Sequence, residues 1–207
     1  MGCSLKWSIV ALLAAVCTLP AQVIEFESNG LRYQTLTRDG LTLMIARLPA
    51  QVRDFTVLQI AVSNGGTRPQ VLRPEDFVLV RPDGTTLPAS SARSVIDTLM
   101  DRARKSDVIK LITTYENSIY GNLQYKGTNG YEARRQSALA EFTSTRVRAA
   151  AAASAIAFVP VKLAPGQSTD GAIFYPNSGK AFMEGRIRVR AAGSEFEFPL
   201  LPLVTVP

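Results

Sequence analysis

A nearly continuous apolar segment, Phe55–Ser63, predicts a central β-strand that is covered on both faces or packed in a sandwich. Side chains of a strand alternate between its two faces, so both faces of this one would be apolar. The first face would carry Leu58, Ile60 and Val62, and the second would carry Phe55, Val57 and Ala61. Asn64-Gly65-Gly66 follows, and because these residues tolerate positive φ the chain is expected to turn there.

Shorter alternating segments predict further strands on both sides of this one. They lie at residues 23–27, 31–37, 41–48, 77–81 and 169–175. Residues 71–73 are bracketed by Pro69 and Pro74, which favours an edge or a connection rather than a central strand. The strand blocks 22–88 and 159–207 would share one core, since neither alone has enough strands to bury both faces.

The clearest hairpin is expected at Arg186–Leu200. A turn centred on Ala192-Gly193 pairs arginines with glutamates on one face and aliphatic with aromatic residues on the other, and loops of two or four residues give the same register. The expected pairs are Arg190 with Glu195, Arg188 with Glu197, Val189 with Phe196 and Ile187 with Phe198. A slip of one residue would break both patterns together.

Residues 92–157 have helical character and are inserted between the strand blocks. Ser90 or Ser91 would cap a first helix, Ser106 a second, and an Ala-rich third helix would run from Tyr131 to about Ala157. An apolar stripe would form along the first two helices, at Val95, Leu99, Val108, Ile112 and Tyr115. A stripe packed on the strands indicates a structural role, whereas an exposed stripe indicates a partner or membrane surface.

The order of framework features resembles that of exported bacterial immunoglobulin-like modules of unknown function. The matching residues are Val57–Asn64, Pro74, Asp76-Phe77-Val78-Leu79, Asp83-Gly84, Leu163-Ala164-Pro165-Gly166, Gly171 and Ile173-Phe174. The resemblance covers residues 41–88 and 159–200 and implies an immunoglobulin-like antiparallel β-sandwich outside the cytoplasm, without an active site. The chain departs from that pattern by its helical insertion, so a single domain over residues 22–207 is expected, interrupted at 92–157.

The N-terminal 21 residues are typical of a secretory signal peptide. Lys6 precedes an apolar run, Trp7–Val16, that is too short to span a bilayer, and cleavage is expected between Ala21 and Gln22. The mature protein would be periplasmic or extracellular, with no transmembrane helix. Both cysteines, Cys3 and Cys17, lie within this segment, so the mature domain would have no disulfide and would depend on its core.

The chain contains no histidine. This excludes Ser-His-Asp and Cys-His catalysis and histidine-ligated metal sites. Three Asp-Gly pairs, at Asp39, Asp83 and Asp170, are interpreted as turns rather than calcium ligands, since no D-x-D cluster accompanies them. No catalytic residue, metal site or cofactor is therefore predicted.

The basic character of the chain belongs to the insertion. The formal net charge is +6, or +5 without Lys6, and residues 92–157 hold ten Lys/Arg against six Asp/Glu. Basic side chains and a loop rich in tyrosine and asparagine make this segment the expected contact surface for a protein or a cell-envelope polymer. The candidate contact residues are Arg102, Arg104, Lys105, Tyr115, Tyr120, Asn122, Tyr125 and Tyr131. Export argues against nucleic acid as a partner, and a solvated helix face is the simpler explanation of the charge.

Together these features favour a non-catalytic exported module that binds or assembles at the cell envelope, with recognition through the insertion. One alternative is a structural subunit of an envelope assembly, in which the helices only cover the sandwich. Another is a hydrolase that uses only carboxylates, which would need two Asp/Glu facing each other roughly 5–10 Å apart. The oligomeric state does not follow from the sequence.

Overall fold

The computed structural model describes residues 22–28, 31–48, 52, 54–107, 109–110, 144–177 and 184–200. These residues form a mainly β structure with helices, and all pairs of neighbouring strands are antiparallel. The expected signal peptide and the central loop, residues 120–131, lie outside the described residues.

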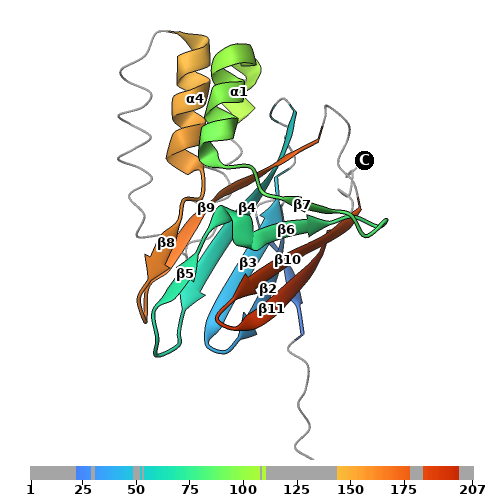
Figure 1. The fold of residues 1–207 in the computed structure, drawn as a ribbon, viewed down its shortest axis with the longest axis vertical. Coiled ribbons are helices and arrows are strands. Elements are labelled where there is room, and N and C mark those ends of the chain that lie inside the picture. Colours follow the sequence, from blue (N-terminus) through green and yellow to red (C-terminus); the bar gives the residue numbers. More distant parts are fainter. Residues whose placement is uncertain are drawn as a thin grey trace, which may run out of the picture.

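Two sheets form the body of the molecule (Figure 1). The larger is five-stranded, in the order β1 (Ile24–Ser28), β2 (Leu31–Arg38), β3 (Leu41–Arg47), β4 (Phe55–Asn64) and β9 (Ser168–Pro176). The smaller is four-stranded, in the order β11 (Ser194–Leu200), β10 (Gly185–Ala191), β6 (Phe77–Val80) and β7 (Thr86–Pro88). A separate two-stranded ladder joins β5 (Gln70–Leu72) to β8 (Val161–Leu163).

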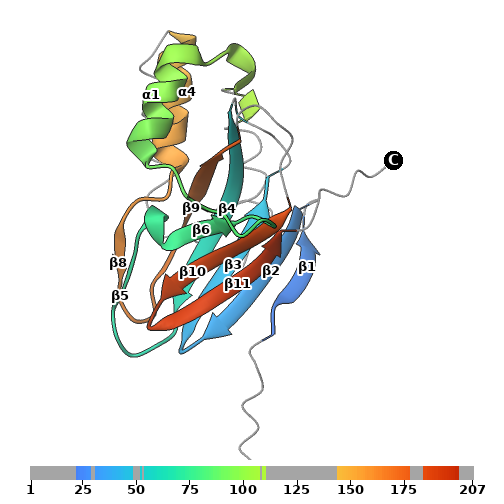
Figure 2. The ribbon, with the colours of Figure 1, turned by 45° about the vertical axis from the view of Figure 1, so that its right-hand side comes forward.

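The two sheets pack face to face (Figure 2). Their inward side chains form one buried cluster, in which Leu58 and Ile60 of β4 lie with Phe77, Phe196 and Phe198 of the smaller sheet. The hydroxyl of Tyr175 on β9 crosses the core and donates to the carbonyl of Phe77 at 3.2 Å. Both strand blocks therefore contribute to one core, as predicted.

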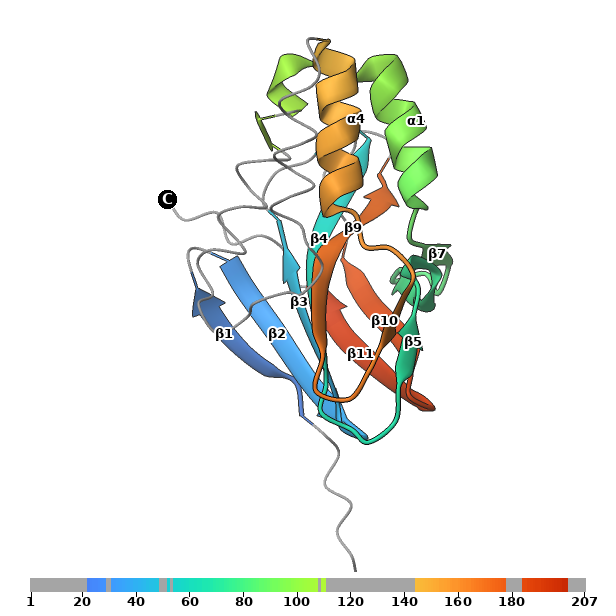
Figure 3. The ribbon, with the colours of Figure 1, turned by 90° about the vertical axis from the view of Figure 1, so that its left-hand side faces the viewer.

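The outer face of the larger sheet is also covered, by helices α1 (Ala92–Arg102) and α4 (Thr145–Ile156) (Figure 3). A second buried cluster joins Phe55, Val57 and Phe174 of the sheet to Val95 and Leu99 of α1 and to five buried residues of α4. The central strand β4 lies between the two clusters, which explains why both of its faces are apolar. The prediction for its two faces is confirmed.

The predicted hairpin has the expected register in β10 and β11. Arg190 pairs with Glu195, Arg188 with Glu197, Val189 with Phe196 and Ile187 with Phe198. The loop has two residues, Ala192 and Gly193, with φ of 55° and 76°. Two successive positive φ angles are the mark of a type I′ turn, whose twist matches that of the flanking strands.

The turn after β4 forms for a reason other than the predicted one. Positive φ is not adopted at Asn64, Gly65 or Gly66. The Asn64 amide instead donates to the carbonyls of Arg68 and Leu163, at 2.8 and 3.0 Å, and accepts from the Gly66 N–H at 3.0 Å. A side chain at Gly66 would come close to the Asn64 amide oxygen, and one at Gly40 would lie 2.7 Å from the Gly66 Cα, so these glycines permit two turns to pack together.

One of the three predicted Asp-Gly turns is wrong, whereas the strand predicted over the same residues, 169–175, is confirmed as β9. Asp39-Gly40 and Asp83-Gly84 lie in turns, but Asp170 and Gly171 lie inside β9, paired with Ala61 and Ile60. A Cβ at Gly171 would lie 2.8 Å from the Cα of Phe158, so this glycine lets the chain after α4 lie directly against β9, where Ala157 forms a parallel bridge with Ala172. The Phe158 N–H donates to the Ala172 carbonyl at 2.9 Å, which fastens this contact.

The helical insertion begins as predicted and differs further on. Ser91 caps α1, accepting the N–H of Ser94 at 3.2 Å. The chain is again helical at 105–107 and 109–110, so Ser106 lies within a helix rather than capping one. At the start of this helical segment, the Asp107 carboxylate accepts the backbone N–H of Arg104 at 2.7 Å. The predicted third helix is present as α4, and its expected earlier part, residues 131–143, lies outside the described residues.

Candidate functional site

The described candidate contact residues lie at the end of the helical layer that is farther from the sheets. Arg102 is the last residue of α1, and Arg104 and Lys105 follow it; all three side chains are exposed. The remaining candidates, Tyr115, Tyr120, Asn122, Tyr125 and Tyr131, lie outside the described residues.

The helix pair brings a second basic segment to the same end. In Figures 1 and 3, α1 runs away from the sheets and α4 returns beside it, so the end of α1 and the start of α4 lie at one pole of the molecule. The first turns of α4 carry Arg146 and Arg148, both exposed. We call the set Arg102, Arg104, Lys105, Arg146 and Arg148 the basic pole. Its two halves are about 40 residues apart in the chain, and only the antiparallel packing of the helices unites them.

Two acidic residues lie beside the first half of the basic pole, Asp101 and Asp107. Arg102 forms an exposed ion pair with Asp101 at 3.0 Å, which is worth little in solvent. The Asp107 carboxylate is directed to the backbone N–H of Arg104. The first turn of α4 contains no acidic residue, although the positive end of a helix dipole favours acids there. Arginine in this turn therefore costs helix stability, by about 0.3–1 kcal/mol per charge.

The predicted apolar stripe is buried where the structure describes it. Val95 and Leu99 are completely buried against the sheet and α4, while Val108, Ile112 and Tyr115 lie outside the described residues. Two other apolar side chains of this region are exposed, Met100 at 42% and Ile109 at 56%. The described helices are thus part of the core, and their outward surface is mainly polar.

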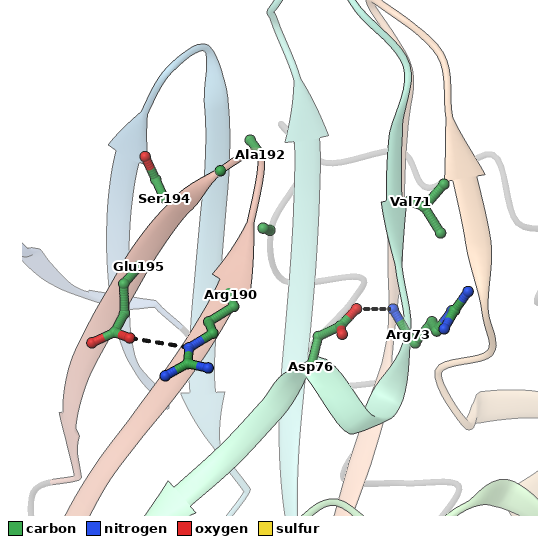
Figure 4. A pocket seen from close by; sticks show the side chains of 9 residues that line it. Val71, Arg73, Asp76, Arg190, Ala192, Ser194 and Glu195 are labelled. Atoms are coloured by element: carbon green, nitrogen blue, oxygen red, sulfur yellow. Dashed lines mark hydrogen bonds and ion pairs between the residues drawn. The ribbon is translucent and has the colours of Figure 1, made fainter.

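A pocket that the sequence did not predict lies at the opposite end of the molecule, beside the turn between β10 and β11 (Figure 4). It is open to solvent, with a volume of about 620 Å³. Its lining residues come from β5, from the 3-10 helix η2 (Pro74–Asp76) with the residue before it, and from the hairpin: Val71, Arg73, Asp76, Arg190, Ala191, Ala192, Gly193, Ser194 and Glu195. The two sides are more than 110 residues apart in the chain, so no local pattern could have revealed it.

The two carboxylates of the pocket are held by separate partners (Figure 4). Asp76 accepts the backbone N–H of Arg73 at 2.7 Å, and Glu195 accepts the Arg190 Nε–H at 3.3 Å. Glu195 also lies 3.8 Å from Nε of Arg188. Since Asp76 turns toward η2 and Glu195 toward the arginines, they are not directed at a common point between them.

The turn of the hairpin is fixed against the larger sheet. The Ser194 hydroxyl donates to the Asp39 carboxylate, and Arg38 donates to the Glu195 carbonyl. Both contacts join this wall of the pocket to the β2–β3 end of the larger sheet.

In the part of the chain that the structure describes, no three His, Cys, Asp or Glu residues are grouped as metal ligands would be. None of the described helices has the length and apolar character needed to cross a bilayer.

No family model matches the sequence significantly, and the same is true of the curated proteins and of the solved structures.

Proposed function

We propose that this chain is a non-catalytic exported module of the cell envelope, built on an immunoglobulin-like sandwich, that binds an acidic partner through the end of its helical insertion that is farther from the sheets. The partner would be a protein or an anionic polymer of the envelope. The N-terminal segment would act as the signal peptide, so N-terminal sequencing of the exported protein should begin near Gln22.

The order of the strands supports the immunoglobulin-like assignment. In the larger sheet, β3, β4 and β9 are neighbours in the positions of strands A, B and E. In the smaller sheet, β11, β10, β6 and β7 have the order of strands G, F, C and an added C′. The insertion would then occupy the connection after C′, where it can fold onto the outer face of the A-B-E sheet.

The observation that carries the binding proposal is the basic pole. Five cations from two separate segments gather at one end, although arginines at the start of α4 oppose the helix dipole. Because this grouping lowers helix stability, it favours a partner over the solvated helix face that the sequence alone suggested. Clustered positive charge on a rigid support attracts acidic surfaces and raises the rate of association with them.

A pull-down from the envelope fraction tests the proposal. The test variant is Arg102→Gln/Arg104→Gln/Lys105→Gln, and the control variant removes three exposed cations elsewhere, Arg32→Gln/Arg68→Gln/Lys162→Gln. Both variants lose the same charge, and neither touches a buried side chain. We expect the test variant to lose its partner at physiological salt while the control retains it. If both retain the same partners, the basic pole is not the contact surface.

One alternative has an observation in its favour. The buried side chains of α1 and α4, among them Val95, Leu99 and Ile156, support a purely structural insertion in a subunit of an envelope assembly. On that alternative neither charge variant should change the partners, whereas Leu99→Ala should destabilise the fold by about 2–5 kcal/mol. The carboxylate-only hydrolase gains no support from the pocket, since Asp76 and Glu195 are directed to different partners.

A further inference from the structure

Strand β1 is the outermost strand of the larger sheet, and no described strand pairs with it on the side away from β2 (Figures 2 and 3). An open sheet edge presents unpaired backbone N–H and C=O groups, and proteins usually close such edges. The opposite edge of this sheet, β9, is closed. There the carbonyls of Ala172 and Phe174 accept the N–H groups of Phe158 and Ser90, at 2.9 and 2.7 Å.

The edges of the smaller sheet are closed as well. On β11, the Glu195 carbonyl accepts the Arg38 guanidinium, and Pro199 has no N–H to offer. At the other edge, β7 has only three residues and ends with Pro88. Among the described edges of the two sheets, β1 is therefore the one that keeps its backbone open.

The turn between β2 and β3 sets the direction of the backbone hydrogen bonds in β2. Its two residues, Asp39-Gly40, have φ of 48° and 77°, as in a type I′ turn. In such a hairpin the flanking residues, Arg38 and Leu41, form a hydrogen-bonded pair. Hydrogen-bonding direction alternates along a strand, so the backbone groups of Tyr33 and Thr35 point away from β3 and toward β1.

The same alternation continues into β1. Phe26 and Ile24 are the partners of the two β2 residues that point toward β1, so their N–H and C=O groups bond to β2. The N–H and C=O groups of Glu25 and Glu27 consequently point away from the sheet, and no described residue bonds to them. An added strand would find both backbone groups of these two residues available.

The side chains of β1 are exposed on both faces of the strand. On the face that carries Tyr33, Ile24 is 63% exposed and Phe26 is 37% exposed. The Phe26 ring stacks on that of Tyr33, with centroids 5.2 Å apart and an interplanar angle of 11°, so one side of it is supported. Ile24 and Phe26 form a narrow apolar surface that an added strand would extend.

The other face of β1 carries two carboxylates. Glu25 accepts the Gln34 amide at 2.7 Å through one oxygen, and Glu27 makes no ion pair with a described residue. Arg32 is opposite Glu27 but lies on β2, so it would be about 10 Å from an added strand, whereas the two carboxylates would be about 5 Å from it. The residues directly opposite the carboxylates in an added strand should therefore be basic.

The same carboxylates select against a second copy of β1 as the added strand. Antiparallel pairing of two copies keeps like faces together, so in every register a glutamate of one copy, Glu25 or Glu27, is opposite a glutamate of the other. Like charges directly opposite one another destabilise a pair of strands. Charge therefore disfavours self-association and favours a basic partner.

We propose that β1 binds an extended basic segment of a partner protein by antiparallel strand addition. The backbone of the partner would bond to Glu25 and Glu27, lysine or arginine side chains would face the two carboxylates, and the apolar side chains between them would lie beside Ile24 and Phe26. Main-chain hydrogen bonds would provide affinity, and the alternating side chains would provide specificity. The site uses no residue of the basic pole and does not depend on it.

Heptapeptides with lysine at alternate positions and varied apolar residues between them test the proposal. Each has a counterpart with glutamine in place of lysine. We expect the mature protein, without an N-terminal tag, to bind a subset of the lysine peptides in fluorescence polarisation. The glutamine counterparts should bind about five-fold more weakly, the combined effect of two exposed ion pairs.

Two N-methylated forms of each peptide test the backbone contact. A lysine opposite Glu25 or Glu27 is in a hydrogen-bonded pair, so its N–H bonds to β1, whereas the N–H of each apolar residue points away. N-methylation of the lysines should abolish binding. N-methylation of the apolar residues, the matched control, should leave it intact.

The variant Glu25→Gln/Glu27→Gln tests the charge contact. It should lose the preference for lysine over glutamine peptides and keep the remaining binding, because its backbone is unchanged. The control Glu75→Gln/Glu184→Gln removes two exposed carboxylates elsewhere and should behave as the wild type. Thermal unfolding monitored by circular dichroism would establish that both variants are folded.

Three results would overturn the proposal. They are binding to no lysine peptide at millimolar concentration, equal effects of the two N-methylations, and a lysine preference that persists in Glu25→Gln/Glu27→Gln. Sedimentation of the protein alone distinguishes a further occupant. A wild-type dimer that dissociates in Ile24→Lys would assign this edge to a second copy of the chain and refute a basic partner.

Discussion

Gly171→Ala adds a single methyl group at the contact between the chain after α4 and β9. The new Cβ would lie 2.8 Å from Cα and 2.9 Å from Cβ of Phe158. These separations are roughly 0.6–0.7 Å inside the normal contact distance of carbon atoms. Neither atom can swing away as the end of a flexible side chain could, so the backbone at residue 158 must move.

That movement disturbs two interactions. The Phe158 N–H donates to the Ala172 carbonyl at 2.9 Å, and the Phe158 ring packs edge-on against Phe77, with centroids 5.6 Å apart. Overpacking in a core costs about 1–3 kcal/mol, and a weakened hydrogen bond adds about 0.5–1.5 kcal/mol. Alanine recovers about 0.4–1 kcal/mol by restricting the unfolded chain. The net loss of stability should be about 2 kcal/mol.

Thermal unfolding measures this loss directly. For a domain of this size, a loss of about 2 kcal/mol lowers Tm by roughly 4–8 °C. Gly65→Ala is the matched control, since its new Cβ would meet only the Gly40 carbonyl oxygen at 3.4 Å. Hydrogen exchange should also be faster at the Phe158 amide. If Gly171→Ala melts within about 1 °C of the wild type, the close approach does not restrain the chain as argued.

Three further predictions concern other parts of the sandwich. Asn64→Ala removes a buried amide that makes three hydrogen bonds, and urea unfolding should show a loss of about 2–3 kcal/mol. Ala192→Gly replaces an alanine at a φ of 55° and should raise stability by about 0.5–1 kcal/mol, visible as a higher Tm. Burial raises the pKa of Tyr33 to about 12 from its ordinary value of 10.0. The folded state favours the neutral phenol, so the contribution of Tyr33 to the free energy of unfolding is complete below pH 10 and is lost as the pH rises toward 12. Thermal unfolding at several pH values between 10 and 12 should therefore show a smaller fall in Tm for Tyr33→Phe than for the wild type.

Elements with strong local patterns were predictable from the sequence. The hairpin β10–β11 was predicted to the residue because alternation and charge pairing agree on a single register. The continuous apolar segment identified β4, and its two apolar faces correctly implied cover on both sides. Strand β8 was anticipated only as a return of strand character after residue 158, and β7 was not given bounds, because three residues are too few to establish a period.

Features that depend on distant segments were not predictable. Gly171 was placed in the predicted strand 169–175, which is confirmed as β9, but its Asp-Gly pair was also taken for a turn, and only the close approach of Phe158 reveals its role. The pocket was missed for the same reason, since Arg73 and Arg190 come together only through the pairing of strands. For the candidate contact surface, the sequence identified Arg102–Lys105 but could not show that α4 brings Arg146 and Arg148 beside them.

The position of α1 and α4 also determines how the function of the insertion can be tested. Deletion of residues 92–157 would uncover Phe55, Val57 and Phe174 on the outer face of the larger sheet. An exposed apolar face of this kind promotes aggregation and nonspecific binding, so a deletion variant would gain or lose partners for reasons unrelated to recognition. Substitutions at the basic pole leave that face covered. A change of partners in the Arg102/Arg104/Lys105 variant, with an unchanged Tm, would therefore separate recognition by the insertion from its structural role.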